Sequence, residues 1–467
     1  MQVLSIRRVT ADHHHNAFTG TEWFQGALYL AFRQGDAHIC DQGRLIVLRS
    51  RDGGVNFEPV AAFRGMAKDL RDAHLYSVDD RRLFLVGFEY NGETLYRQSG
   101  TAWTDNGLSW SPWTSFAGTN GWVLWRPEYF QGRYYCAGYH APMPIHEESE
   151  WCVAWFESDD GLHWRKVRIL RQNRDLPNES SLAFRSDGLA AILMRREVNA
   201  TPNPLLFRSM PPYDQWTVME MNVPLRGPAL WFVGHDIWIG GRWFLPSGST
   251  HVGIFKAIHD EAVLQCVLPS GPGSDCSYIG VAPNPSAPRR VWLSYYSPHV
   301  APADPAVSQW THPDVYVADV ICDEPFIQSW QVSDVSQQIG GLNSAIYPVR
   351  NEDVSMVWTG ERANMPCGYV EARRIIGKRA GIVYFVAEIQ AESFESAVLQ
   401  LGYDGPIRVW LNGREIFKGV GSVPAQPDQS NVDVQFQAGA NRLVIAMDTD
   451  GGRAGQIYAR TYSSALK

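Results

Sequence analysis

The 467-residue chain is too long for one ordinary core, and its length suggests two or three domains. Its 45% hydrophobic and 19% charged residues are typical of a globular protein, whereas its 18 tryptophans are unusually many. A net charge of −8 supplies no positive field, so neither nucleic acid nor a membrane is expected as a partner. The N-terminus lacks the apolar core of a secretory signal, and no apolar run reaches membrane-spanning length, which predicts a cytoplasmic protein.

Neither the cysteines nor the histidines indicate a metal centre. The seven cysteines are odd in number, scattered and mostly inside apolar runs, which is typical of buried thiols. The run from His13 to His15 has no carboxylate or thiol at ligand spacing beside it, so a role other than metal binding is expected. We therefore expect no metal ion and no cofactor.

A repeat of about fifty residues runs through the first part of the chain. Three segments share the pattern Asp-x-Gly-x-x-aromatic and begin at Asp52, Asp105 and Asp159, and a degenerate fourth copy ends at Trp216. Asp and Gly favour a tight turn, which the aromatic residue anchors in the fold. We expect these aspartates to lie on hairpin turns remote from any active site and to support folding.

Each repeat also contains an apolar run rich in β-branched and aromatic residues, as strands have. Four strands with their turns take about this repeat length in a propeller blade. Helical periodicity is nearly absent. We therefore predict an all-β fold whose first domain, residues 1–326, is a six-bladed β-propeller. The six runs are residues 28–33, 83–88, 134–139, 189–194, 236–240 and 291–296.

From about residue 340 the repeat stops and shorter alternating strands begin. The segments 382–386, 398–401 and 407–411 read as strands, and Asn412-Gly413 marks a two-residue hairpin. Alternation around residues 432–436 and 443–447 fits half-buried antiparallel strands. We predict a jelly-roll-like β-sandwich over residues 340–467, with a structural role and no catalytic groups.

The three turns at blade spacing resemble the Asp boxes of the sialidase (neuraminidase) superfamily, over about residues 12–326. The resemblance implies a divergent, sialidase-like enzyme whose partner is an oligosaccharide or polysaccharide. In that family the starts of the innermost strands and the ends of the next strands meet at one face of the propeller. These positions are unusually polar in this chain, which favours a ligand site. The strand starts hold His15, Asn16, Arg71, Asp72, Trp125, Arg126, Asn178, Glu179, Arg226 and Asp275. The ends hold Arg33, Glu89, Tyr90, His140, Arg195, Arg196, Glu197, Tyr295 and Tyr296.

Two segments resemble sialidase catalytic segments most closely. The run Asn178-Glu-Ser-Ser-Leu followed by Arg195 is similar to the one that carries a glutamate and an active-site arginine. The segment from Asp275 to Gly280 looks like the one that holds the nucleophilic tyrosine. The resemblance implies that Tyr278 is the nucleophile and Glu179 its proton acceptor. A phenol with a pKa near 10 attacks poorly until a carboxylate takes its proton.

The chain also departs from the family. The first of three substrate-binding arginines normally lies in an Arg-Ile-Pro motif, where this chain has His15-Asn-Ala-Phe18. The acid/base aspartate that follows the blade-one arginine is replaced by His38, with Asp36 nearby. The third arginine is missing from residues 249–252, so Arg226 would have to substitute for it. Sialic acid is therefore not the expected substrate.

Three functions remain open. The first is an exo-acting glycoside hydrolase, in which His38 or Asp72 protonates the leaving oxygen while Tyr278 or water attacks the anomeric carbon. The second is a polysaccharide lyase, in which a histidine or tyrosine removes the proton beside a uronate carboxylate that an arginine neutralises. The third is a propeller that binds glycans without catalysis and stacks sugars on tryptophans. The residues expected to bind substrate are His15, Asn16, Arg33, Arg71, Trp125, Arg126, Arg195, Arg226 and Asp275.

Overall fold

The structure is a computed structural model that divides into two compact units. One unit is Val3–Cys322, and the other joins Met1–Gln2 to Asp323–Lys467. Residue 326, the end predicted for the first domain, lies outside the described residues. The described residues are 1–65, 69–92, 94, 96–141, 151–172, 175–197, 203–245, 249–258, 261–271, 275–287, 289–300, 312–322, 327, 329–337, 340–350, 353–354, 356–357, 370–391, 394–421, 425 and 429–463.

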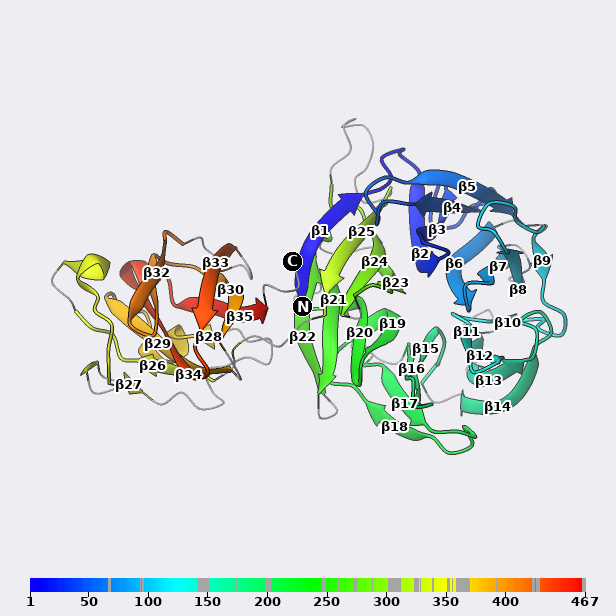
Figure 1. Cartoon of the computed structure of the whole chain (residues 1–467). Helices are drawn as coiled ribbons and strands as arrows, with labels where there is room; N and C mark the ends of the chain where they lie inside the picture. The colour runs from blue at the N-terminus through cyan, green and yellow to red at the C-terminus, as the bar shows by residue number, and fades with distance from the viewer. Residues whose placement is uncertain are drawn as a thin grey trace. The chain divides into compact units, whose positions relative to one another are not determined.

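In the described part of the first unit, six antiparallel sheets lie around a common centre (Figure 1). First strands of neighbouring sheets contact one another at this centre. The first three sheets contain β2 (His15–Phe24), β3 (Ala27–Gly35), β4 (Arg44–Ser50), β5 (Glu58–Arg64); β6 (Asp69–Val78), β7 (Arg82–Asn91), β8 (Tyr96–Thr104), β9 (Thr114–Ser115); and β10 (Trp122–Val123), β11 (Glu128–Phe130), β12 (Arg133–His140), β13 (Cys152–Ser158), β14 (Arg165–Gln172). The other three contain β15 (Ser180–Phe184), β16 (Ala190–Met194), β17 (Leu205–Ser209), β18 (Thr217–Glu220); β19 (Leu225–Val233), β20 (Asp236–Phe244), β21 (Thr250–Ile258), β22 (Glu261–Leu268); and β23 (Ser277–Pro283), β24 (Arg290–Ser297), β25 (Asp314–Ile321).

The last sheet takes its fourth strand from the other end of the chain. Its order is β23, β24, β25 and β1 (Gln2–Arg8), so the N-terminal strand forms its outer edge. The backbone N–H of Val9 donates to the carbonyl oxygen of Val315 at 2.8 Å, and Arg8 pairs with Asp314. Sharing one sheet between the two ends closes the ring of sheets. Each apolar run found in the sequence lies in the second strand of one sheet.

The Asp-x-Gly segments connect the third and fourth strands of the first three sheets. Asp52 accepts two backbone N–H bonds of its own turn, at 3.1 and 2.9 Å. In the next two turns, Asn106 and Asp160 accept the equivalent bonds at 2.8 to 2.9 Å. Asp105 and Asp159 instead form ion pairs with arginines. The hairpin location is as predicted, and the side chains that accept the backbone bonds in the second and third turns lie one position after Asp105 and Asp159. The cause is that these turns are one residue shorter between cap and aromatic anchor.

A β-bulge interrupts four of the first strands at equivalent positions. The pairing with the second strand shifts after Ala17 in β2, Arg71 in β6, Arg226 in β19 and Ser277 in β23. The residue that follows each shift is left-handed. These residues are Phe18, Asp72, Gly227 and Tyr278, with φ of 57°, 56°, 56° and 50°. Bulges redirect side chains and are frequent beside active sites.

In the described part of the second unit, two antiparallel sheets pack through one apolar cluster that includes Phe385, Leu399, Ile445 and Ile457. This is a β-sandwich. The six-stranded sheet contains β26 (Gln331–Ser333), β27 (Met356–Val357), β29 (Ile382–Ala391), β31 (Ile407–Leu411), β32 (Arg414–Gly419) and β34 (Gly439–Asp448). The four-stranded sheet contains β28 (Val370–Glu371), β30 (Glu395–Tyr403), β33 (Ser430–Phe436) and β35 (Gln456–Ser463). The helices are η2 (Gly341–Ser344), α2 (Arg373–Ile376) and η4 (Asp450–Gly452).

The predicted Asn412-Gly413 hairpin connects β31 to β32. Both residues are left-handed, with φ of 51° and 84°, as a two-residue turn of this type requires. Among the described residues, no helix has the length and apolar character needed to cross a membrane.

Candidate active site

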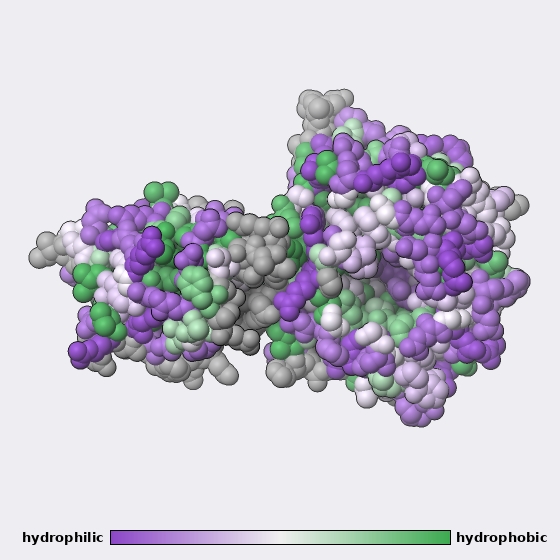
Figure 2. All heavy atoms as spheres, in the orientation of Figure 1, coloured by the Kyte–Doolittle hydropathy of each residue, from purple (hydrophilic) through white to green (hydrophobic). Residues whose placement is uncertain are grey.

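A pocket of about 300 Å³ opens where the first strands begin and the second strands end. It contains all four residues that the sequence assigned to catalysis, and two of the nine assigned to substrate binding. Figure 2 shows a hollow near the centre of one face of this unit, with hydrophilic residues around it. The pocket is lined by Phe18, His38, Ile39, Arg71, Asp72, Phe88, Tyr90, Arg97, Tyr139, Glu179, Arg195 and Tyr278.

Tyr278, Glu179 and Arg195 form a hydrogen-bonded group in this pocket. The Tyr278 hydroxyl donates to Oε1 of Glu179 at 2.8 Å, and Arg195 donates to Oε2 of Glu179 at 2.5 Å. Arg195 also donates to the Tyr278 oxygen at 3.0 Å. The backbone explains part of this arrangement, because the N–H of Arg195 donates to the carbonyl oxygen of Glu179 and holds the two residues side by side.

The neighbours of Tyr278 hold its ring in place. Phe18 and Trp125 pack edge-on against it, with ring centroids at 5.0 and 5.7 Å. Gly227 faces the same ring, and a Cβ at this position would lie 2.8 Å from it. Glycine at this left-handed position therefore leaves the space that the tyrosine ring fills. Burial raises the pKa of Tyr278 well above its usual value, so the phenol keeps its proton until a base takes it.

Asp72 occupies the same bulge position in β6 that Tyr278 occupies in β23. Its left-handed backbone turns the side chain into the pocket. Burial raises the pKa of Asp72 to about 7, and the negative charge of Glu179 adds to this, against the opposing effect of Arg71. A carboxyl group with a pKa near neutrality is suited to give and take a proton.

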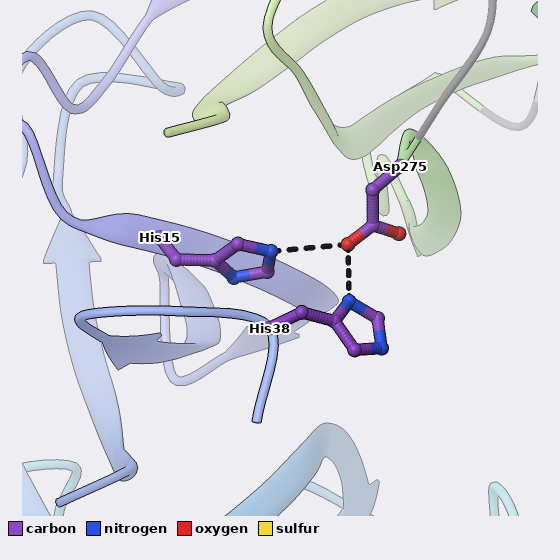
Figure 3. Close-up of side chains that lie close together, drawn as sticks. All are labelled: His15, His38 and Asp275. Atoms are coloured by element: carbon purple, nitrogen blue, oxygen red, sulfur yellow. Dashed lines mark hydrogen bonds and ion pairs between the residues drawn. The ribbon is translucent and has the colours of Figure 1, made fainter. Parts of the chain in front are cut away.

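Asp275 lies beside the pocket and binds two histidines through one oxygen (Figure 3). Oδ2 contacts Nε2 of His15 at 3.0 Å and Nδ1 of His38 at 2.5 Å. Oδ1 accepts bonds from Arg242 at 2.9 Å and from the Tyr296 hydroxyl at 2.7 Å. Burial alone would raise the pKa of Asp275, but the bonds from the histidines and the charge of Arg242 outweigh it and hold the pKa well below its usual value.

The loop that carries His38 is held by a second group of charges. Arg71 donates to the carbonyl oxygen of His38 at 2.6 Å and contacts its Nε2 at 3.3 Å. Arg71 also pairs with Asp69 at 3.0 Å, and Asp69 binds Arg33 through both carboxylate oxygens. Arg33 is fully buried, so it positions this loop and does not line the pocket.

The other residues assigned to substrate binding also lie outside the pocket lining. Asn16 is buried and donates to Asp12 at 2.7 Å. Trp125 is buried behind Tyr278. Arg226 pairs with Glu197, which binds Arg195 from the side opposite Glu179. His15 and Asp275 belong to the cluster in Figure 3.

Arg126 lines a second cavity of about 270 Å³, enclosed by residues of the inner strands of all six sheets. This axial cavity also contains Glu22, His74 and Glu128. Burial raises the pKa of Glu22 and of Glu128 to about 8, and the charge of Glu128 adds to the effect on Glu22. Burial lowers the pKa of Arg126 to about 10.

Sequence reasoning missed Arg242, which binds Asp275 and lies 5.8 Å above the centre of the Tyr278 ring. It lies near the end of β20, a second strand, which is the kind of position that drew attention to Arg33 and Arg195. Applying that criterion to β20 would have found it. Arg97 was also missed, because it reaches the pocket from a third strand, β8.

No family model matches the chain, and no curated protein is similar to it in sequence. Solved structures do match. One is a protein of unknown function from Dyadobacter fermentans, with 15% identity over 68% of this chain and 98% of its own, and a TM-score of 0.56. Another is the endosialidase of phage phi92, with 11% identity over 74% of this chain and 72% of its own, and a TM-score of 0.53. The propeller unit has a sialidase-like fold.

A third similar structure is an α-L-arabinofuranosidase of Fusarium graminearum, solved with arabinobiose. It shares 12% identity over 68% of this chain and 97% of its own, with a TM-score of 0.51. These likenesses confirm the predicted fold class. At such identities they show the fold alone, and an argument about activity has to come from the pocket.

Proposed function

We propose that the chain is an exo-acting glycoside hydrolase that removes a sugar other than sialic acid from the end of a glycan. The observation that supports this most directly is the hydrogen bond between the Tyr278 hydroxyl and Glu179, reinforced by Arg195. A pocket of about 300 Å³ has room for a small ligand such as the terminal sugar of a glycan. All the residues of this proposal precede Cys322, so the sandwich supplies none of the catalytic groups.

In the first step, Glu179 takes the proton of Tyr278, and the phenolate oxygen attacks the anomeric carbon. Arg195 donates to both side chains, so it stabilises the negative charge as it moves from the carboxylate to the phenolate. The bond to the leaving oxygen breaks as that oxygen receives the proton of Asp72. Asp72 suits this role because its pKa of about 7 leaves much of it protonated at neutral pH.

In the second step, water attacks the anomeric carbon of the tyrosyl glycoside while Asp72 takes a proton from the water. The Tyr278 oxygen leaves and recovers its proton from Glu179. Each of the two attacks inverts the configuration at the anomeric carbon, so the product retains the configuration of the substrate. His38 borders the same pocket, and we assign it to positioning because Asp275 and Arg71 contact both of its ring nitrogens.

The choice of a non-sialic sugar rests on the arginines. Where sialidases have their first arginine, β2 presents Phe18 to the pocket. Of the arginines that line the pocket, Arg195 is bound by two carboxylates and Arg71 by Asp69, so neither is free to clamp a substrate carboxylate. Arg97 already donates to the carbonyl oxygen of Ala141. Each missing charge-assisted bond to such a group forfeits about 1.5–3 kcal/mol.

Incubation with a panel of oligosaccharides, followed by mass spectrometry of the products, tests this function. Hydrolysis adds the mass of water, elimination gives an unsaturated product of unchanged total mass, and a binding protein leaves the glycan intact. A 2-fluoro glycoside of the reacting sugar should then label Tyr278 and not its neighbour Tyr296. Elimination products, efficient release of sialic acid or a label on another residue would each contradict the proposal.

A further inference from the structure

The mechanism above leaves unexplained why two histidines and an aspartate meet in one cluster at the edge of the pocket. We propose that His15, His38 and Asp275 bind a divalent transition metal ion of the zinc class. The site goes beyond the glycosidase chemistry, which uses none of the three as a reacting group.

The geometry carries this inference. One ligand atom from each residue, Nε2 of His15, Nδ1 of His38 and Oδ2 of Asp275, lies within 4.8 Å of the other two. They come from the start of β2, the loop after β3 and the segment before β23, and they point toward one another in Figure 3. Two imidazole nitrogens and one carboxylate oxygen form a donor set that zinc and related metals use when one or more positions stay open.

The surroundings fix the ligand atoms. Arg242 and Tyr296 occupy Oδ1 of Asp275, which leaves Oδ2 for an ion. Arg71 holds the His38 backbone by donating to its carbonyl oxygen, and the imidazole ring presents Nδ1 to Asp275. Such outer contacts orient metal ligands in many proteins.

One side of the cluster is accessible. The His15 side chain is buried, whereas that of His38 is 51% exposed and also lines the pocket. An ion held here would therefore keep open positions toward the pocket, where water or a sugar hydroxyl can complete its coordination. From the sequence we expected no metal ion, because His38 and Asp275 are 23 and 260 residues away from His15 and form no local spacing pattern with it.

The test is metal binding by the full chain, measured without reference to activity. The protein is freed of metal with a chelator and titrated with Zn²⁺ by calorimetry, and Co²⁺ uptake is followed by its visible spectrum. We expect one site for Zn²⁺ and Co²⁺ and no binding of Mg²⁺ or Ca²⁺, which prefer oxygen ligands. His38→Ala should weaken Zn²⁺ binding by at least about 100-fold, and Tyr296→Phe by about 10-fold, because it removes an outer contact.

His14→Ala is the matched control. His14 adjoins His15 and contacts Asp36 at 3.4 Å, an exposed histidine–aspartate pair outside the cluster. This variant should bind Zn²⁺ like the wild type. The proposal is overturned if the wild type binds no Zn²⁺ or Co²⁺, which would leave the cluster as a hydrogen-bond network only. It is equally overturned if binding survives His38→Ala or is lost with His14→Ala. His38 lies on a loop, so its variant should fold even where His15→Ala or Asp275→Asn does not, and circular dichroism checks this.

Discussion

The pocket and the axial cavity share the inner strands of the propeller, yet they hold carboxyl groups in different states. In and beside the pocket, Glu179 lies against Arg195 and Asp275 against Arg242, each at hydrogen-bond distance. In the axial cavity, burial raises the pKa of Glu22 and Glu128 to about 8, although the charge of Arg126 opposes this for Glu128. For Asp275, the hydrogen bonds of the histidines and the charge of Arg242 outweigh burial, whereas for Glu22 and Glu128 burial prevails and favours the neutral acid.

Asp72 combines features of both places. It lines the pocket and adjoins Arg71, but burial prevails and raises its pKa to about 7. The pocket therefore contains a carboxyl group that can donate a proton beside a carboxylate, Glu179, that is paired with an arginine and hydrogen-bonded to a phenol. A carboxyl group whose pKa is raised by burial is a frequent proton donor in active sites.

The largest expected effect comes from removing the tyrosine–carboxylate pair. Tyr278→Phe should lower kcat by about 10⁴-fold or more, and Glu179→Gln by about 10²–10⁴-fold, because the nucleophile or its base is lost. Glu197→Gln is the matched control, since Glu197 binds the same arginine from the other side. We expect it to change kcat at most about 10-fold. Steady-state kinetics on the first glycan that reacts checks this, and equal losses for Glu179→Gln and Glu197→Gln would remove Glu179 from its role.

The second prediction concerns pH. If Asp72 is the proton donor, kcat/KM should fall about tenfold per pH unit above its pKa of about 7. Asp72→Asn should abolish this alkaline limb and lower kcat by about 10²–10⁴-fold at neutral pH. A sugar with a good leaving group, such as a nitrophenyl glycoside, needs less proton donation and should lose less. An unchanged pH profile in the variant would assign the limb to another group.

The fold could be read from the sequence, because turn chemistry and alternating apolar runs are local signals. Six second strands and the Asn412-Gly413 hairpin followed from residues close together in the chain. The bulges that turn Asp72 and Tyr278 into the pocket left no such signal, since φ near 50° is uncommon for tyrosine and is adopted by only a minority of aspartates. The repeat pattern also drew attention to Asp105 and Asp159, whereas the side chains that accept the backbone bonds of those turns are the next residues, Asn106 and Asp160. A sequence pattern did not distinguish two adjacent polar residues.

The site was predicted less completely than the fold. Strand-start positions indicated Asp72 and Glu179, because the first strands meet at the centre, and the resemblance to sialidases indicated Tyr278. The same criterion also selected Asn16, Trp125 and Arg126, which do not line the pocket. They lie behind the pocket or in the axial cavity. Position along a strand does not reveal which side of the strand a side chain takes once a bulge shifts the alternation.

The third prediction uses the axial cavity. Because the pKa of Glu22 is raised in the folded state, its neutral form stabilises the fold below the unfolded value near 4.5, and this contribution is lost as pH rises through about 8. Each pKa unit is worth about 1.4 kcal/mol, reduced by any solvent that enters. Glu22→Gln should therefore be closer to the wild type at pH 5 and more stable at pH 9. Thermal unfolding at both pH values checks this, with Glu261→Gln, at an exposed position at the start of β22, as a control that should shift neither. A variant that is less stable than the wild type at pH 9 would show that the folded protein does not raise the pKa of Glu22.

The smallest effects belong to the turns far from either cavity. Asp160 accepts two backbone N–H bonds at 2.8 Å, so Asp160→Ala leaves two donors without their partner and should cost about 1 kcal/mol of stability, as loss of a helix cap does. Asp159, one position earlier, forms only an exposed ion pair with Arg133, and Asp159→Ala should change stability by less than about 0.5 kcal/mol. Urea unfolding of both variants, with kcat measured in parallel, separates the two residues.

Neither change should lower kcat, because neither turn contributes to the pocket. If Asp159→Ala lowered the free energy of unfolding more than Asp160→Ala, the turn would depend on Asp159, and the hydrogen bonds of Asp160 would contribute little to stability.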